Sequence, residues 1–348
     1  MKPQRVWYLG AADAEMAMIA TFLMSAEETW RYAMDPRWHR VHPSTAYQWD
    51  APVDATHLVE CGRVCPPGAV RVDHHNPGDP GYGKGPARFW RASSIGQVLA
   101  VLGITVEWRQ GEKGSTVYAF GPTKGHDALP KRMPGVAAER VLMIAAADHC
   151  LAAAYAERCP GVAPDRLRAC RALMRAEWLA SGTDPARDMP RREIAAIAGY
   201  SSAEEIDGGW GTPAAPSPGA IERWTAAVGA AYRYTAALLS DAPLISLGGV
   251  SIIDLRGVGT LPELPEVLAL TGRGAVYRMA GPAGWSARIK IGVIGCGEGS
   301  VPGTAPVEAF LGGWAEAEGL VDIYPVHDGT ADGIRAAAAR GYAGGYLP

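Results

Sequence analysis

The sequence lacks the features that mark membrane proteins and proteins that bind duplex nucleic acid. It contains no uninterrupted apolar run of about 18 residues, the length that a membrane-spanning helix needs, so we expect no membrane segment. Its 33 basic residues do not exceed its 36 acidic residues, and the net charge of −3 gives no overall basic footprint for a duplex. The first five residues lead directly into a predicted strand. We therefore expect no signal peptide and a cytoplasmic location.

Cysteine is also scarce, with six residues scattered along the chain. Cys61 and Cys65 form the closest pair, and no second pair stands at the spacing of a zinc finger. We interpret the cysteines as free thiols in packed surroundings, which fits a reducing cytoplasm. At 348 residues, 48% of them hydrophobic, the chain has room for two domains with cores of their own.

What the sequence does contain is a set of acidic and histidine residues at the ends of short apolar runs. Each of three runs typical of buried strands leads to such residues: Val6–Leu9 to Asp13, His57–Glu60 to Glu60 itself, and Ala69–Val72 to Asp73, His74 and His75. In open parallel α/β sheets, ligand sites form beyond the carboxyl ends of the strands. A polar turn is the alternative interpretation, because Asn-Pro-Gly follows the histidines. Three strands with such residues at the same edge favour a binding site.

A fourth candidate ligand lies on a predicted helix over residues 137–156. Asp148 falls on the apolar face of this helix, whose other members are Val141, Ile144, Ala145, Leu151, Ala152 and Tyr155. A carboxylate on an apolar face is costly unless it is paired or binds a cation. Capping of a neighbouring loop or pairing with an arginine are the alternatives. Beside the acidic and histidine residues above, we favour metal ligation.

The order and spacing of these segments resemble the DHH family of phosphoesterases, which includes RecJ-type exonucleases, oligoribonucleases, cyclic-dinucleotide phosphodiesterases and exopolyphosphatases. The resemblance extends over residues 5–160, and its matching segments are Gly10–Glu15, Val59–Gly62, Val72–His75, Ala92–Leu99 and Ala146–His149. It implies an α/β fold: a parallel-sheet domain with helices on both faces, and a smaller C-terminal α/β domain.

The resemblance also implies roles for individual residues. Asp13, Glu60, His74 and Asp148 would bind the metal, Asp73 would orient the two histidines, and His75 would contact a substrate phosphate or the leaving oxygen. The expected catalytic residues are thus Asp73, His74 and His75. An oxygen-rich set with one imidazole suits Mn²⁺ or Mg²⁺ better than Zn²⁺.

The sequence departs from the family at a second metal site. Ala11 stands where the family has a ligand Asp, and residues 5–12 contain no histidine, so this second site is missing in the preferred register. A shifted register would pair Asp13 with Glu15 and restore two acids without the histidine. We prefer the first register, because Ala14 then takes the small position that opens the helix.

Proline- and glycine-rich segments divide the chain further along. We expect a DHH-type catalytic domain over residues 1–180, a linker region over 181–219, and a C-terminal substrate-binding domain over 220–348. That last part begins with an amphipathic helix and continues with four strand-like runs, at 244–247, 250–255, 275–279 and 288–294. It also carries further candidates for substrate contacts: Arg288, Lys290, Gly344 and Gly345.

From these observations we predict a metal-dependent hydrolase of a phosphodiester or phosphoanhydride bond in a nucleotide or short oligonucleotide. Two alternatives stay open. One is a protein on the same fold that binds or senses a phosphorylated ligand without hydrolysing it, and the other is a different reaction on a phosphorylated substrate. The sequence also leaves open the substrate, the number of metal ions, and whether the chain forms a homodimer.

Overall fold

A computed structural model of the chain describes residues 5–41, 45–75, 78–82, 84–111, 115–126, 128–130, 132–181, 185–208, 217–247, 250–255, 261–271, 274–281, 284–292, 315–316 and 320–323. The residues group into two compact units. The first contains residues 1–163 and 313–318, and the second contains residues 164–312 and 319–348. Among the described helices, none is both long enough and apolar enough to cross a bilayer.

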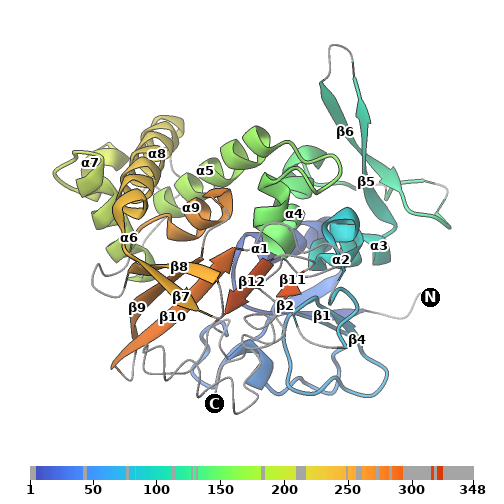
Figure 1. Ribbon diagram of the computed structural model, residues 1–348. Coiled ribbons are helices and arrows are strands. Elements are labelled where there is room, and N and C mark those ends of the chain that lie inside the picture. Colours follow the sequence, from blue (N-terminus) through green and yellow to red (C-terminus); the bar gives the residue numbers. More distant parts are fainter. Residues whose placement is uncertain are drawn as a thin grey trace. The chain divides into compact units, whose positions relative to one another are not determined.

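A four-stranded parallel sheet forms the centre of the first unit (Figure 1). Its strand order is β2 (Thr29–Tyr32), β1 (Val6–Leu9), β3 (His57–Val59) and β4 (Val70–Val72). Since each neighbouring pair is parallel, all four carboxyl ends lie at one edge. The expected α/β class with a parallel sheet is confirmed. Three of these strands match the predicted ones, whereas β2 was not predicted.

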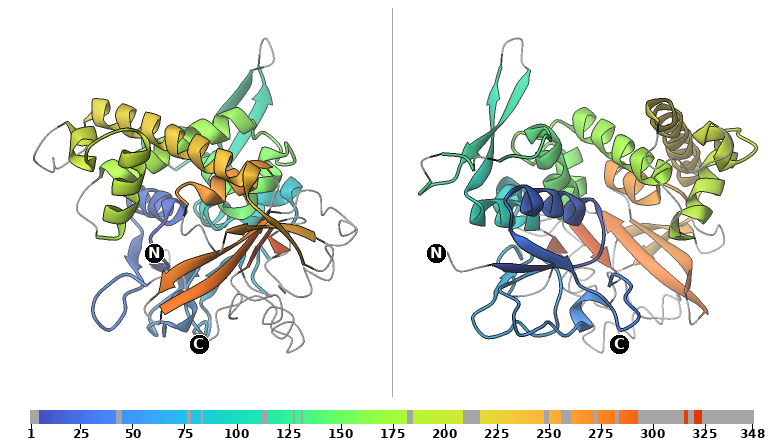
Figure 2. Two further views of the ribbon diagram at one scale, coloured as in Figure 1. Left: turned by 60° about the vertical axis from the view of Figure 1, so that its left-hand side comes forward. Right: turned by 180° about the vertical axis from the view of Figure 1, so that it is seen from behind.

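The two faces of this sheet are covered differently. Helix α1 (Ala14–Ser25) lies along one side of the sheet (Figure 2) and contacts β2, α3 (Ser94–Val101) and α4 (Ala138–Tyr155). The other face carries Tyr8 and Leu58, which pack on residues from the connection between β2 and β3. We expected helices on both faces. The described part of that connection carries the 3₁₀ turn η1 (Ala46–Gln48) and an isolated bridge between Met34 and Arg40.

The rest of the first unit supports the sheet or projects from it. A 3₁₀ turn η2 (Pro86–Arg88) and the short helix α2 (Phe89–Ala92) precede α3. The antiparallel hairpin of β5 (Ile104–Gln110) and β6 (Thr116–Pro122) extends outward in Figure 1. Helix α4, predicted over 137–156, is kinked at Cys150, where φ is −157° and ψ is 55°. The unit also includes the two-residue strand β11 (Ala315–Glu316).

The second unit begins with helices and continues with a sheet. Helices α5 (Pro164–Ala180), α6 (Pro185–Ile197), α7 (Ala203–Asp207) and α8 (Pro218–Asp241) share a core around the fully buried Trp224. Strands β12 (Leu320–Ile323), β10 (Gly284–Gly292), β9 (Gly274–Gly281), β8 (Val250–Leu255) and β7 (Leu244–Leu247) follow one another in the sheet, and helix α9 (Leu264–Thr271) lies between β8 and β9 in the sequence. The predicted amphipathic helix and the four strand-like runs correspond to α8, β7, β8, β9 and β10.

The boundary between the units falls after residue 163, whereas we placed the end of the first domain at residue 180. The physical reason is the packing of α5. Its residues Ala176 and Leu179 are fully buried in the core that contains Trp224, so α5 belongs with α8. The roles that we assigned to the domains, catalysis and substrate binding, stay predictions.

Candidate metal centre

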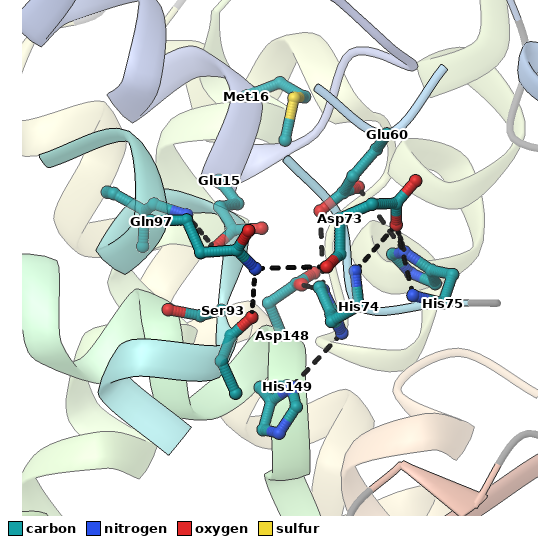
Figure 3. A network of polar contacts seen from close by, with 12 residues as sticks. Glu15, Met16, Glu60, Asp73, His74, His75, Ser93, Gln97, Asp148 and His149 are labelled. Carbon is teal, nitrogen blue, oxygen red and sulfur yellow. Dashed lines mark hydrogen bonds and ion pairs between the residues drawn. The ribbon is translucent and has the colours of Figure 1, made fainter. Parts of the chain in front are cut away.

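Four segments of the first unit bring acidic and histidine side chains together (Figure 3). They are the start of α1, the residue after β3, the loop after β4, and the middle of α4. The ends of β1 and β3 approach closely, because a Cβ on Gly10 would stand 2.3 Å from the carbonyl oxygen of Glu60. Glu60 itself has a φ of +50°, a left-handed conformation that is uncommon outside glycine. A tight backbone arrangement therefore places the Glu60 side chain.

Glu15, Glu60, His74 and Asp148 form the four-residue centre. Each offers one ligand atom, and these atoms all lie within 4.8 Å of one another. The Nε2 atom of His74 is 2.8 Å from Oδ2 of Asp148 and 3.4 Å from Oε1 of Glu60. A second, overlapping group consists of Glu60, His74 and His75. Because the two groups share Glu60 and His74, they outline one compact place for a cation.

Two carboxylate oxygens in the centre are buried without a hydrogen bond from any described residue, Oε2 of Glu15 and Oε1 of Glu60. Glu15 is only 1% exposed, and its other oxygen accepts a hydrogen bond of 2.9 Å from the amide of Ile95 at the start of α3. Burial, together with the charges of Asp148 and Glu60, raises the pKa of Glu15 well above its usual value. An uncompensated buried carboxylate is costly, so this arrangement calls for a proton or a cation.

The pKa of Glu60 is shifted in the opposite direction from that of Glu15. Burial opposes its ionisation, but His75 and His74 outweigh that effect and lower the pKa of Glu60 to about 2. Burial and the neighbouring carboxylates thus favour the protonated form of Glu15, whereas the two histidines favour the ionised form of Glu60. The donor set is three carboxylates and one imidazole, which fits a hard divalent cation such as Mn²⁺ or Mg²⁺.

Asp13 lies near this centre but is not one of its four members. Its side chain accepts a hydrogen bond of 2.7 Å from the amide of Met16 and so caps the N-terminus of α1. Asp13 is exposed to solvent, and the nearby Asp148 and Glu60 carboxylates raise the pKa of its carboxyl group. The structure thus gathers three of the four expected ligands, and Glu15 takes the place that we expected for Asp13.

Asp73 holds the backbone of the histidine pair. Its Oδ1 atom accepts hydrogen bonds from the amides of His74 (2.7 Å) and His75 (3.1 Å), from Nδ1 of His75 (3.0 Å) and from the hydroxyl of Tyr47 (3.1 Å). Burial opposes ionisation of Asp73, but the hydrogen bond and charge of His75 and the charge of His74 lower its pKa overall. The side-chain amide of Gln97 donates to the carbonyl oxygen of Asp73 at 3.0 Å and ties this loop to α3.

The orientation of His74 is set from its far side by His149. Nδ1 of His149 is 3.2 Å from Nδ1 of His74, and Nε2 of His149 is 2.9 Å from the carbonyl oxygen of Lys84. A carbonyl only accepts, so Nε2 of His149 carries the hydrogen. Burial and the charge of His74 lower the pKa of His149 to about 3, which keeps His149 neutral and its Nδ1 an acceptor. His74 must then donate from Nδ1, and its Nε2 faces the carboxylates.

The two histidines of the loop differ in their exposure. His74 is buried, yet the Asp148 and Glu60 carboxylates raise its pKa well above the usual value. His75 is partly exposed; burial and His74 oppose its protonation, but Glu60 and Asp73 outweigh them and raise its pKa to about 9. At neutral pH, His75 is therefore a cation at the side of the centre that solvent reaches.

The remaining predicted site residues belong to the second unit or fall outside the described residues. Arg288 and Lys290 are in β10 of the second unit. Gly344 and Gly345 lie outside the described residues. The sequence interpretation gave no role to His149, Gln97 or Tyr47. The position of His149 directly after Asp148 was the one signal that could have suggested its role.

Comparisons with known proteins add little to this geometry. No family model and no curated protein sequence matches the chain. Among solved structures, a pGpG-specific phosphodiesterase, PggH from Vibrio cholrae, is similar to it with 15% sequence identity and a TM-score of 0.37. The alignment covers 97% of each chain.

Proposed function

We propose that this chain is a metal-dependent phosphoesterase that hydrolyses a phosphodiester or phosphoanhydride bond in a nucleotide or short oligonucleotide. One observation carries the proposal: the ligand atoms of Glu15, Glu60, His74 and Asp148, from four separate segments, lie within 4.8 Å of one another. Two buried oxygens among them have no hydrogen bond within the described part of the chain. Such a set is unfavourable by itself and becomes favourable with a divalent cation.

Glu15, Glu60, His74 and Asp148 would hold the ion, with Mn²⁺ or Mg²⁺ as the expected metals. When bound, a divalent ion supplies neutralisation of phosphoryl oxygens and activation of water. The motif order, which resembles that of the DHH phosphoesterases, supports the same chemistry.

The other side chains contribute binding and proton transfer. His75 is a cation at neutral pH, and its Nδ1 atom is held 3.0 Å from Oδ1 of Asp73. As a cation, His75 would bind a phosphoryl oxygen or give a proton to the leaving oxygen. Asp73 keeps its own charge and fixes the imidazole ring. His149 fixes the tautomer of His74 that leaves Nε2 free for a metal.

The test combines binding with turnover. Calorimetric titration of the wild type with Mn²⁺ should show saturable binding, and His74→Ala should abolish it without loss of the fold. A panel of cyclic dinucleotides, linear dinucleotides, nucleotides and polyphosphate is then incubated with saturating Mn²⁺. We expect product from at least one member, and none without the metal. Stabilisation by these ligands without product would instead support the sensor alternative, and unchanged Mn²⁺ affinity in His74→Ala would refute the assigned centre.

A further inference from the structure

The loop that follows β2 presents an exposed tryptophan between arginines at the same sheet edge as the metal centre. Trp38 is 82% exposed, and Arg37 and Arg40 beside it are exposed as well. Strand β2 runs parallel to β1, with Tyr32 opposite Leu9. The chain after Tyr32 therefore continues beyond the same carboxyl edge as the chain after Leu9, which leads to Asp13 and Glu15.

Several hydrogen bonds hold the loop that carries Trp38. Oδ1 of Asp35 accepts hydrogen bonds from the amides of Arg37 (2.8 Å) and His39 (2.9 Å). Met34 and Arg40 form an antiparallel bridge that closes the loop, and the indole nitrogen of Trp49 donates to the carbonyl oxygen of Met34 at 2.9 Å. Together these contacts present the outer residues of the loop in one conformation.

Within this loop, Trp38 has a φ of +64°, a conformation that costs a bulky residue free energy. A large aromatic side chain gains nothing from burial when it is mostly exposed. Trp38 thus combines two features that do not favour folding, a strained backbone and an exposed aromatic ring. An aromatic ring held open to solvent is the arrangement with which proteins stack nucleobases.

The neighbouring arginine completes a surface for an anion. The guanidinium carbon of Arg40 lies 3.7 Å from the centre of the Tyr32 ring, so the guanidinium is held in place by a cation–π contact. Its N–H groups remain able to bind phosphate oxygens. Partial burial raises the pKa of the Tyr32 hydroxyl, Arg40 opposes this, and the charge of Asp13 adds to it. Tyr32 is therefore within electrostatic reach of Asp13, which lies near the metal centre.

We propose that Tyr32, Arg37, Trp38 and Arg40, the Trp38 platform, bind the nucleotide part of the substrate: Trp38 stacks on a nucleobase and the arginines bind an adjacent phosphate. The inference deepens the proposed function, on which it rests, by making the substrate one that contains a base next to its phosphate. A base-free polyphosphate would then lack one of the two contacts.

A pair of ligands that differ only in the base tests this proposal. Adenosine 5′-monophosphate and ribose 5-phosphate are titrated calorimetrically into the protein with Ca²⁺ replacing Mn²⁺, so that binding is measured without relying on turnover. Stacking on an aromatic side chain is worth a factor of about ten or more in affinity, so Trp38→Ala should weaken the adenosine ligand about tenfold. It should leave ribose 5-phosphate unchanged, and Trp38→Phe should restore most of the loss.

Two further variants sharpen the result. Arg40→Ala should weaken both ligands, since both carry the phosphate. Val53→Ala, at a 99% exposed apolar residue of the same β2–β3 connection, should change neither. Equal affinity of the wild type for the two ligands, no measurable binding of the adenosine ligand, or an unaltered preference in Trp38→Ala would overturn the proposal. Because these titrations need no product, absence of hydrolysis would count against the proposed function alone.

Discussion

Nδ1 of His149 lies 3.2 Å from Nδ1 of His74, and the bond that His149 makes to the carbonyl oxygen of Lys84 decides which of the two donates. The result is a chain of hydrogen bonds that runs from the protein backbone through two imidazoles to Asp148; Figure 3 shows the two imidazoles and Asp148. A histidine that binds a metal needs a partner for its second nitrogen, and His149, next to Asp148, would provide that partner for His74.

Replacement of His149 should therefore weaken metal binding without direct loss of a ligand. Loss of such a partner typically costs about 10- to 100-fold in metal affinity, and we expect a decrease in this range for Mn²⁺ with His149→Phe. Calorimetry measures it. His57→Phe is the matched control, because His57 is also a buried histidine but stacks on Trp7 at the opposite end of β3. Equal Mn²⁺ affinities in both variants would contradict the role of His149.

The role of Glu15 can be tested through the protons that metal binding releases. Without a metal, burial and the neighbouring carboxylates favour the protonated form of Glu15, and Asp148 and Glu60 favour the protonated form of His74. Mn²⁺ should displace protons from both, so the heat of binding should depend on the ionisation enthalpy of the buffer. Glu15→Gln should reduce the number of protons released by about one and lower the affinity strongly.

The control for this comparison is Asp13→Asn, which keeps a side-chain oxygen for the cap of α1. It should lower Mn²⁺ affinity less than Glu15→Gln does, because Asp13 lies outside the four-residue centre. The reverse order of the two effects would show that the preferred register from the sequence is correct and that Asp13 is the ligand.

Replacement of Asp148 tests whether this residue is a metal ligand or one half of a structural ion pair. It lies 2.8 Å from Nε2 of His74, and its side chain is 25% exposed. We expect Asp148→Asn to abolish Mn²⁺ binding and activity with only a modest fall in melting temperature. If the pair with His74 were purely structural, its loss would destabilise the fold by about 3–5 kcal/mol and leave metal affinity intact. A thermal melt beside a Mn²⁺ titration resolves the two.

The free energy of unfolding of the metal-free protein should depend on pH through the protonation of His75. Its pKa of about 9 in the folded state lies above the usual value near 6.5, so the folded protein binds the extra proton between these two pH values. This stabilisation is complete below about pH 6.5 and is lost as pH rises through about 9. It amounts to at most about 3 kcal/mol, since one pKa unit corresponds to about 1.4 kcal/mol.

Urea unfolding at a series of pH values between 6 and 10 measures this effect, with His75→Gln as the comparison. The variant should show a flatter dependence across that interval, because its residue 75 does not titrate. Parallel curves for wild type and variant would mean that His75 is not held as a cation by Asp73 and Glu60.

The sequence was sufficient to predict the parallel sheet and much of the centre. Val6–Leu9 was predicted as a strand and is β1. Glu60 and His74 were expected at the carboxyl edge of the sheet and Asp148 on a helix face, and their ligand atoms do lie close together, while their role as metal ligands stays a prediction. These predictions succeeded because the period of apolar residues and the rule for parallel sheets are local or topological. Strand β2 was missed because it has four residues, one of them an exposed arginine, and little apolar pattern.

The choice between Asp13 and Glu15 depended on tertiary packing. An Asp at the start of a helix is a typical N-cap, which is what Asp13 becomes. Glu15, two residues later, could equally have faced solvent. It is buried because α3 lies against α1 and offers the amide of Ile95. The contact between His149 and the carbonyl oxygen of Lys84 joins residues 65 positions apart, so no local pattern predicts it.

The two carboxylate oxygens of Glu15 have different surroundings. One accepts a hydrogen bond from the amide of Ile95, and the other is buried in the four-residue centre. A change of charge at the centre should therefore alter the hydrogen bond between the amide of Ile95, at the start of α3, and Glu15. The amide proton of Ile95 thus serves as a built-in spectroscopic reporter, whose resonance and exchange rate would register the arrival of an ion without any substrate or added probe.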